Sequence, residues 1–447
     1  MAIREELDTP IAGEYDVVVA GAGPAGVPAA LAAARNGART LLIETNSCLG
    51  GVWTAGILTW VFDIEKTGIG HEIIGRLRER NGYVESGFRE MVNFTYDVES
   101  MKLLLEQLCL ESGIDIYLHT RVVGADVDPH TKRLRAIITE SKSGRQAWKA
   151  HAFIDCTGDG DLGARAGCGY DFGSDDSDEI QPLTFMSTIV VPDHHELEPY
   201  ISFYGGSTEH RERSNAFKAY LADLGIDPSY AVPTLFQVRE NLLAIMVNHQ
   251  YGVVSHDARQ MTDATISARS EVNTIVDALA RSSGPFGGCY LASTAEHIGI
   301  RDGRRIHGRY RMTVDDLIAG SRFDDAVCRV RFNVDIHATR RDVRDRPSQN
   351  SPRGVHVQPY DIPIRALIAK DVDGLMMAGR CISGDWFAHA SYRVTGEAVS
   401  MGEAAGVAAA VSAEQKRLPH EVRWDDIQPR IPEIRDSWYD PVGGRTG

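Results

Sequence analysis

The chain has 447 residues and a formal net charge of −15, from 47 Lys plus Arg against 62 Asp plus Glu. This acidic balance argues against a general binder of nucleic acid or of anionic membranes. The hydrophobic fraction of 43% is that of a globular protein, and no apolar run is long enough for a transmembrane helix. The seven cysteines form no C-x-x-C or metal-type cluster, which favours reduced thiols, a cytoplasmic location and no metal site.

Residues 15–44 predict a strand, a glycine turn, an alanine-rich helix and a second strand. The valine-rich run 15–20 is typical of a buried parallel strand. The second strand, 40–43, ends at Glu44, about 20 residues past the glycines, where a ribose-binding carboxylate is expected. The stretch therefore predicts a dinucleotide site, with NAD and FAD both open.

The spacing of the three glycines has a physical cause. Gly21 allows the tight turn out of the strand, and Gly23 leaves the backbone open to a pyrophosphate. Gly26 lets the helix pack closely on the strand, so that the free N–H groups at the helix start face the phosphates. The alternative is an ordinary turn with three glycines, which leaves Glu44 unexplained.

Further along the first part of the chain, Gly50-Gly51 would let the backbone lie against a planar ligand. Cys48 is predicted to be a packing or flavin-side residue, because no second cysteine follows within a few positions. Helical periodicity predicts helices over 68–82 and 98–112, the second capped by Asp97. Strands at 134–139 and 147–154, joined by a hairpin turn, predict an antiparallel β-meander.

A second glycine turn follows an apolar strand at 152–156. It contains Thr157, Gly158 and Asp161, and it either holds more of the same ligand or is a plain glycine-rich loop. Residues 175–300 have no cofactor signature. Strand patterns at 183–191 and 240–248 and helical patterns at 210–226 and 262–283 predict an inserted antiparallel sheet with helices.

Arginines are dense between 297 and 318, and a solvated basic surface is favoured for most of them: Arg301, Arg304, Arg305, Arg309 and Arg311. Thr313 is a predicted N-cap, with Asp316 at the capping-box position. His337, placed at a strand end, is either structural or catalytic. A third strand and glycine turn precede a helix of small residues over 389–414, which starts near Val394.

Four ordered stretches together resemble the FAD dependent oxidoreductase family, a branch of the glutathione-reductase-like flavoproteins with two dinucleotide-binding domains. They are GAGPAG with Glu44 and LGG, then FIDCTGDGDLGARAG, then GIRDGRRIHGRYRMTVDDL with FNVDIH, and YDIPIRAL through SYRVTGEAVSMGEAAGVAAA. The resemblance implies one non-covalent FAD. The cofactor-binding residues that it implies are Gly21, Gly23, Ala25, Gly26, Glu44, Gly50, Gly51, Val122, Thr157, Gly158, Asp161, Gly379, Arg380, Val394, Gly396 and Glu397.

The predicted fold is α/β, with a Rossmann-like FAD-binding domain that has a parallel sheet and a β-meander, and an inserted α+β substrate domain. The FAD-binding domain would span 1–174 and 336–415, the substrate domain 175–335, and a C-terminal extension 416–447. The substrate pocket is expected between the two domains.

The predicted function is hydride transfer between a small organic substrate and flavin N5, of the dehydrogenase or oxidase type. Candidates for acid–base work and substrate anchoring are His337, His389, Arg340, Tyr392 and Arg393. Three alternatives stay open: an aromatic monooxygenase, a non-catalytic flavin-bearing electron-transfer subunit, and an NAD-only dehydrogenase.

No second G-x-G-x-x-G follows a strand, so no dedicated nicotinamide domain is expected. The predicted redox partner is then oxygen or an electron-carrier protein. We expect no nucleic-acid or membrane partner, and a homo-oligomer is open.

Overall fold

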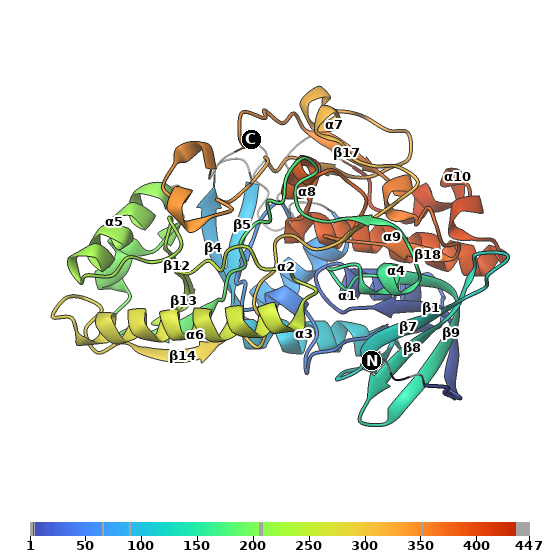
Figure 1. Ribbon diagram of the computed structural model, residues 1–447, viewed down its shortest axis with the longest axis horizontal. Coiled ribbons are helices and arrows are strands. Elements are labelled where there is room, and N and C mark those ends of the chain that lie inside the picture. The colour runs from blue at the N-terminus through green and yellow to red at the C-terminus, as the bar shows by residue number, and fades with distance from the viewer. Residues whose placement is uncertain are drawn as a thin grey trace.

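The structure is a computed structural model that describes residues 3, 5–64, 67–88, 91–204, 209–349 and 352–434. Figure 1 shows two parts side by side, a larger one with the central sheet and a smaller one in green and yellow. Each part has a hydrophobic core of its own.

The larger part is built on a seven-stranded sheet of order β6-β2-β1-β9-β8-β7, with β18 also paired to β9. Five strands are parallel: β1 (Ile11–Ala20), β2 (Thr40–Ile43), β6 (Asp115–Tyr117), β9 (Gly144–Asp155) and β18 (Leu375–Met377). Apolar side chains fill both faces of β1 from Val17 onward, as expected for a strand covered on both sides. The predicted α/β fold with a parallel sheet is confirmed.

The predicted β-meander is formed by β7 (Arg121–Val127), β8 (Leu134–Ser141) and β9, each antiparallel to the next. The strands expected at 147–154 and 152–156 are one continuous strand. Its first part pairs with β8, and its end pairs with β18, so β9 leads directly from the meander into the second glycine turn.

Helix α1 (Gly26–Arg35) packs against α9 (Thr395–Gln415), the helix of small residues. A Cβ at Gly402 would lie 2.0 Å from the Ala25 carbonyl oxygen, and one at Gly406 would lie 2.1 Å from that of Ala29. Only glycine permits this approach of two helix backbones. The helix expected over 389–414 is two helices, because α8 (Trp386–Tyr392) ends before α9 begins.

The smaller part holds a four-stranded antiparallel sheet of order β12-β13-β11-β14. Its strands are β11 (Ser187–Val190), β12 (Thr234–Arg239), β13 (Leu242–Met246) and β14 (Tyr290–Thr294), packed with α5 (His210–Asp223) and α6 (Ala258–Arg281). These confirm the antiparallel sheet with helices predicted for 175–300. Its buried core runs from Leu183 to Ile298 and includes Ile57 and Trp60 from the larger part of the chain.

Buried residues from Ile306 to Val334 belong to the larger core. Packing therefore ends the second core near Ile298, whereas the predicted domain boundary was at 335. Two predicted caps are confirmed: Asp97 accepts from Ser100 N at 2.7 Å, and Thr313 forms a capping box with Asp316.

The other elements connect these layers. They are η1 (Gly51–Trp53), β3 (Trp60–Val61), α2 (Ile69–Glu79), β4 (Tyr83–Phe88), β5 (Met91–Tyr96), α3 (Val98–Glu111), α4 (Asp161–Arg165), β10 (Tyr170–Asp171), η2 (His195–Tyr200), β15 (Arg305–Ile306), α7 (Val314–Ala319), β16 (Ala326–Val330), η4 (Arg341–Val343), η5 (Pro347–Gln349), β17 (Tyr360–Pro363), η6 (Ile364–Leu367), η7 (Pro419–Glu421), α10 (Trp424–Ile427) and η8 (Gln428–Arg430). All seven cysteines are buried and free. Among the described residues, no helix is both long and apolar enough to cross a membrane.

Candidate active site

The turn after β1 shows why each of its glycines is needed. A Cβ at Gly21, whose φ is +89°, would lie 2.5 Å from the Cys156 carbonyl oxygen, and one at Gly26 would lie 1.8 Å from the Gly21 oxygen. A Cβ at Gly23 would meet nothing within 4 Å. The first and third glycines thus allow close packing, and the second faces open space at the start of α1, which fits a pyrophosphate.

Glu44 lies against this turn and is 5% exposed. One carboxylate oxygen accepts from Ala22 N at 2.7 Å, and the other accepts from the backbone and side-chain nitrogens of Asn46 at 2.8 Å. Gly50 N donates to Ala22 O at 2.7 Å, so the Gly50-Gly51 segment is tied to the same turn. The ribose contact of Glu44 stays a prediction, and the carboxylate also holds the turn in shape.

The second glycine turn is organised by Asp155 at the end of β9. Its carboxylate accepts from Thr157 N and Oγ1, at 3.0 and 2.7 Å, and from Gly163 N at 2.8 Å. Burial raises the pKa of Asp155 to about 6, although these hydrogen bonds act to lower it. The Thr157 side chain is therefore committed to the turn, while Gly158 faces the cavity described below.

The third glycine turn meets the other two. Gly379 has a φ of +86°, and a Cβ there would lie 3.1 Å from the Ala25 Cβ. Arg380 donates to Asp159 at 2.6 Å and to Ile300 O at 2.9 Å, with its guanidinium beside Gly158. Three turns far apart in the chain thus form one concave surface of backbone and small side chains.

Some of the predicted cofactor residues line the cavity described below, and others do not. Ala25, Gly158, Gly379, Arg380 and Val394 line the cavity. Gly396 does not, because it packs on the backbone of Phe62 and Asp63, and Glu397 is fully buried. Asp161 is paired with Arg304 at 3.0 Å, and Val122 is buried in β7.

The cavity has a volume of about 380 Å³ and is lined by both parts of the molecule. Part of the lining comes from the glycine turns and the start of α9. The rest comes from side chains of the smaller part and of the segments that join it. The latter group includes Leu58, Trp60, Phe62, Met186, Phe203, His210, Tyr230, Phe236, Met246, Arg301, Phe332, Asp335, His337 and Arg393.

The far wall of the cavity is aromatic. Trp60 stacks on Phe203 and Phe236, with ring centroids 4.3 and 5.1 Å apart, and Phe62 contacts Trp60 and Phe332 at 5.6 and 5.4 Å. None of these residues was predicted from the sequence to belong to the site. They come from four separate segments, so no local spacing marks them as one surface.

A polar cluster lies on the same wall. Asp335 Oδ2 is 3.2 Å from both His337 Nε2 and Arg393 Nη2, and Arg393 also donates to the Asp335 carbonyl at 2.8 Å. Gln181 accepts from His337 N at 3.1 Å and from Arg393 at 3.3 Å. His337 is not at a strand end as expected, because β16 ends at Val330 and residues 331–338 form no helix or strand.

The charges in this cluster fix its protonation. Burial acts to raise the pKa of Asp335, but His337, Arg393 and Arg301 lower it well below its usual range. The pKa of His337 is lowered by burial and then by Arg301, against the pull of Asp335. A neutral imidazole thus lies beside an ionised carboxylate. Asp335 is deep in the protein, yet its side chain is 44% exposed because it faces the cavity.

Three predicted catalytic candidates lie away from the cavity, which corrects the expectation that they contact substrate. Arg340 has a side chain 70% exposed and pairs with Asp342. Tyr392 is fully buried and donates to the Ile382 carbonyl at 3.0 Å. His389 is fully buried behind the wall, and burial lowers its pKa far below the usual range. His337 and Arg393 do line the cavity.

The expectation of a solvated arginine surface is wrong for three positions, and one of them is Arg304, whose side chain is 11% exposed and paired with Asp161. Arg301 lines the cavity. Arg305 is 1% exposed and donates to the carbonyls of Gly384 and Gly173, each at 2.9 Å. Arg309 and Arg311 do form exposed pairs with acidic residues, as expected of a basic surface.

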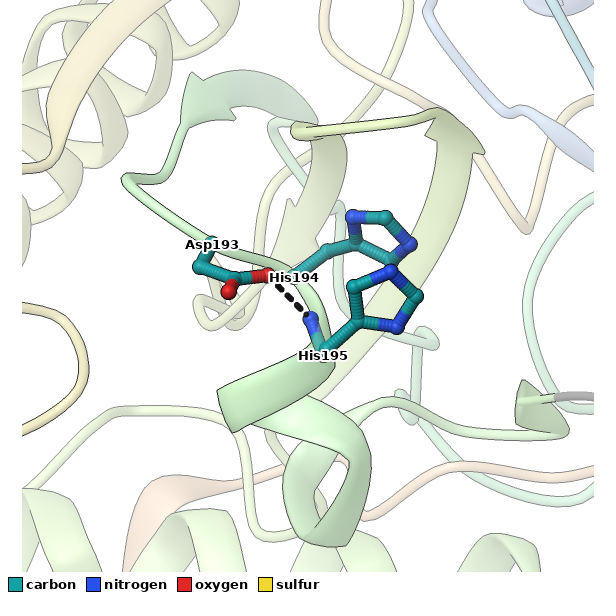
Figure 2. Close-up of side chains that lie close together, drawn as sticks. All are labelled: Asp193, His194 and His195. Atoms are coloured by element: carbon teal, nitrogen blue, oxygen red, sulfur yellow. Dashed lines mark hydrogen bonds between the residues drawn. The ribbon is translucent and has the colours of Figure 1, made fainter.

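Asp193, His194 and His195 come together outside the cavity, as Figure 2 shows. The two rings lie 4.0 Å apart, and their Nδ1 atoms contact Asn241 at 2.9 Å and Tyr204 at 3.0 Å. Asp193 and His195 are exposed. The hydrogen bonds within the cluster account for its geometry, so it gives no reason to assign a metal.

The fold and the converging glycine turns define a flavoenzyme of the dinucleotide-binding class. The sequence matches the family described as "FAD dependent oxidoreductase" over residues 16–431. The chain belongs to this family, and it is an oxidoreductase whose cofactor is FAD.

Other likenesses are short or remote. The tRNA uridine 5-carboxymethylaminomethyl modification enzyme MnmG of Bacillus licheniformis is 69% identical over 35 residues, which is 8% of this chain and 6% of that protein. A geranylgeranyl bacteriochlorophyll reductase-like protein of Thermoplasma acidophilum has a TM-score of 0.46 at 12% identity, over 94% of this chain and 82% of that one. The anhydrotetracycline hydroxylase OxyS of Streptomyces rimosus has a TM-score of 0.47 at 12% identity, over 93% and 65%. These likenesses identify no substrate.

Proposed function

We propose that the protein oxidises a small organic substrate in the cavity between the glycine turns and the aromatic wall. One observation carries the proposal: a single cavity is lined both by the cofactor turns and by the Asp335–His337–Arg393 cluster. Ligand sites form preferentially where two parts of a protein meet. FAD, when bound at the turns, supplies the acceptor for the hydride that leaves the substrate carbon.

His337 is the proposed base for the proton that leaves the substrate oxygen or nitrogen. An ionised carboxylate can only accept hydrogen bonds, so the proton of His337 resides on Nε2, facing Asp335. The lone pair is then on Nδ1, which has no hydrogen bond to a described residue. Nδ1 takes up the proton, and Asp335 stabilises the resulting imidazolium.

The other side chains hold the proposed base in position and shield the substrate from water. Arg393 and Gln181 hold Asp335 and the backbone of His337 in place. The aromatic wall excludes water and offers flat faces to an apolar substrate. We propose that oxygen or an electron-carrier protein then takes the two electrons.

Anaerobic bleaching of the flavin by a panel of hydroxy acids, amines and aromatic acids tests the proposal. His337→Gln should slow bleaching by about 10²- to 10⁴-fold with FAD still bound, because base catalysis is lost. His256→Gln is the matched control, since His256 is exposed and outside the cavity. Bleaching by no member of the panel, or an unchanged rate in His337→Gln, would contradict the proposal.

The aromatic wall also favours a second candidate, an FAD-dependent aromatic monooxygenase. Six aromatic side chains line the cavity: Trp60, Phe62, Phe203, Tyr230, Phe236 and Phe332. Substrate-stimulated oxidation of NADPH, with labelled oxygen from O₂ appearing in the product, would support this candidate over a dehydrogenase or oxidase. If the isolated chain turns over substrate, either as a monooxygenase or as a dehydrogenase or oxidase, a purely electron-transferring subunit is excluded.

A further inference from the structure

The cavity wall carries more positive than negative charge. Its lining includes three arginines, Arg301, Arg380 and Arg393, and one carboxylate, Asp335. Arg380 is paired with Asp159 at 2.6 Å, and Arg393 is paired with Asp335 at 3.2 Å. Arg301 has no ion pair with any described residue, so one guanidinium is left over.

Arg301 is held in place by neutral groups through one nitrogen only. Nη1 donates to the Pro182 carbonyl at 2.8 Å and to Thr184 Oγ1 at 2.6 Å. Nε and Nη2 make no hydrogen bond with the part of the chain that the structure describes. The side chain is thus fixed at one corner while the rest of its planar fork keeps free donors.

The nearest carboxylates do not satisfy this fork. Asp302 is fully buried and accepts instead from Gln181 N, Gln181 Nε2 and Trp386 Nε1, at 2.7 to 3.0 Å. Asp335 is occupied by His337 and Arg393. Both act on Arg301 only at a distance.

The other titratable groups here add no compensating charge. His210 lines the cavity with its ring stacked on Phe203, and burial lowers its pKa to about 4, so it is neutral at pH 7. Burial, and next the charge of Arg393, lowers the pKa of Arg301 to about 10, so this arginine stays charged. A cation in an apolar cavity is costly unless an anion joins it.

We infer that the substrate is a small aromatic or apolar acid whose carboxylate is bound by Arg301. The inference rests on the proposed function, since it takes the cavity to be the substrate site. The free edge of the guanidinium suits a carboxylate bound through two parallel hydrogen bonds. One surplus positive charge balances a monoanion, and the Asp335 carboxylate on the same wall disfavours a dianion such as phosphate.

Binding to the FAD-loaded protein tests this inference without turnover. The probes are benzoate and phenylacetate, each paired with its neutral amide, and inorganic phosphate as a dianion. Binding is read from the change in the visible spectrum of the bound flavin. The acids should bind about 10- to 100-fold more tightly than the amides, and phosphate should not compete with benzoate.

Arg301→Met should abolish the preference for acid over amide, and Arg301→Lys should keep part of it, because lysine retains the charge without the fork. Arg259→Met is the control, since Arg259 is 83% exposed on α6. Amides that bind as tightly as the acids, no binding of any probe, competition by phosphate, or an unchanged preference in Arg301→Met would each overturn the inference. The acid–amide comparison on the unmodified protein stands even where a variant fails to fold. Benzoate and phenylacetate have no C–OH or C–NH group to oxidise and serve only as binding probes. Tight binding of these acids together with no bleaching by any hydroxy acid, amine or aromatic acid of the panel would contradict the oxidation proposal alone.

Discussion

The cavity joins two regions built from opposite kinds of residue: a cofactor end of glycine turns with the helices α1 and α9, and a substrate end of aromatic and charged side chains. At the cofactor end, backbone and small side chains pack closely, and a Cβ at Gly26 or Gly402, neither of which lines the cavity, would lie within 2.0 Å of a carbonyl oxygen. At the far end, the wall is made of large rings and charged groups, such as the stack of Trp60 on Phe203 and Phe236. A cofactor that is bound along its length needs close backbone approach, whereas a small substrate needs side chains that surround it.

This difference predicts which substitutions each end tolerates. Adding atoms should damage the cofactor end, and removing atoms should damage the substrate end.

Trp60→Ala should have the largest effect, a loss of about 3–5 kcal/mol in the free energy of unfolding. Trp60 is 1% exposed and its removal would leave a cavity between Phe203 and Phe236. Trp60→Phe should cost less, because Trp60 Nε1 is buried without a hydrogen-bond partner among the described residues. Urea unfolding of the FAD-loaded protein measures both. Equal losses for the two variants would contradict this account of the wall.

Gly402→Ala should lower the free energy of unfolding by about 1–3 kcal/mol, since its Cβ would press on the Ala25 carbonyl and separate α9 from α1. Gly75→Ala is the matched control. It lies within α2 with nothing within 4 Å of an added Cβ, and it should stabilise by about 0.4–1 kcal/mol. Denaturant unfolding measures the change in the free energy of unfolding, which should be negative for Gly402→Ala and positive for Gly75→Ala. A loss of bound FAD is expected only in Gly402→Ala. A change of the same sign in the free energy of unfolding for both variants would contradict the prediction.

Glu403→Gln should stabilise the protein at pH 8 by on the order of 1–3 kcal/mol. Burial raises the pKa of Glu403 to about 7, above its ordinary value of 4.5. The folded protein then holds a proton that the unfolded chain has released, so stability falls as pH rises from about 4.5 to 7. The amide keeps an acceptor for Ile69 N, which Glu403 binds at 3.1 Å. Unfolding curves at pH 5 and 8 test this, and equal pH dependence of both proteins would contradict it.

For Asp335, which lines the cavity, the sign is opposite to that of Glu403. The pKa of Asp335 is lowered by His337 and Arg393 against burial, so its contribution to stability is present above its ordinary value of 3.8. That contribution is lost as pH falls toward the folded pKa. Asp335→Asn should therefore reduce the loss of stability on acidification, whereas Glu403→Gln should leave the acidic limb unchanged.

Glu44→Gln should have the smallest effect, about a tenfold loss of FAD affinity. The amide can keep one hydrogen bond to Ala22 N or Asn46, but it lacks the charge and the second acceptor. Titration of the apoprotein with FAD, followed by flavin fluorescence, measures the change. Glu14→Gln, on the exposed start of β1, is the control. Unchanged affinity in Glu44→Gln would show that the carboxylate only shapes the turn.

The cofactor end could be predicted from local sequence patterns. Three glycine turns, each after a strand, and an acid at the end of β2 were predicted from spacing, and the structure has them in those places. Such features can be predicted because each depends on residues that are neighbours in the chain. A turn with positive φ favours glycine, as at Gly21 and Gly379, and a helix start favours a capping residue such as Asp97 or Thr313.

Only the tertiary structure decided the substrate end. Arg301 was predicted to belong to a basic surface, and Trp60 and Asp335 were not singled out. Tyr392 and Arg340 were candidates that the fold placed in the core and at the surface. The physical reason is that a cavity wall is assembled from segments far apart in the chain. Whether a side chain meets water, a partner or a cavity depends on which segments pack beside it.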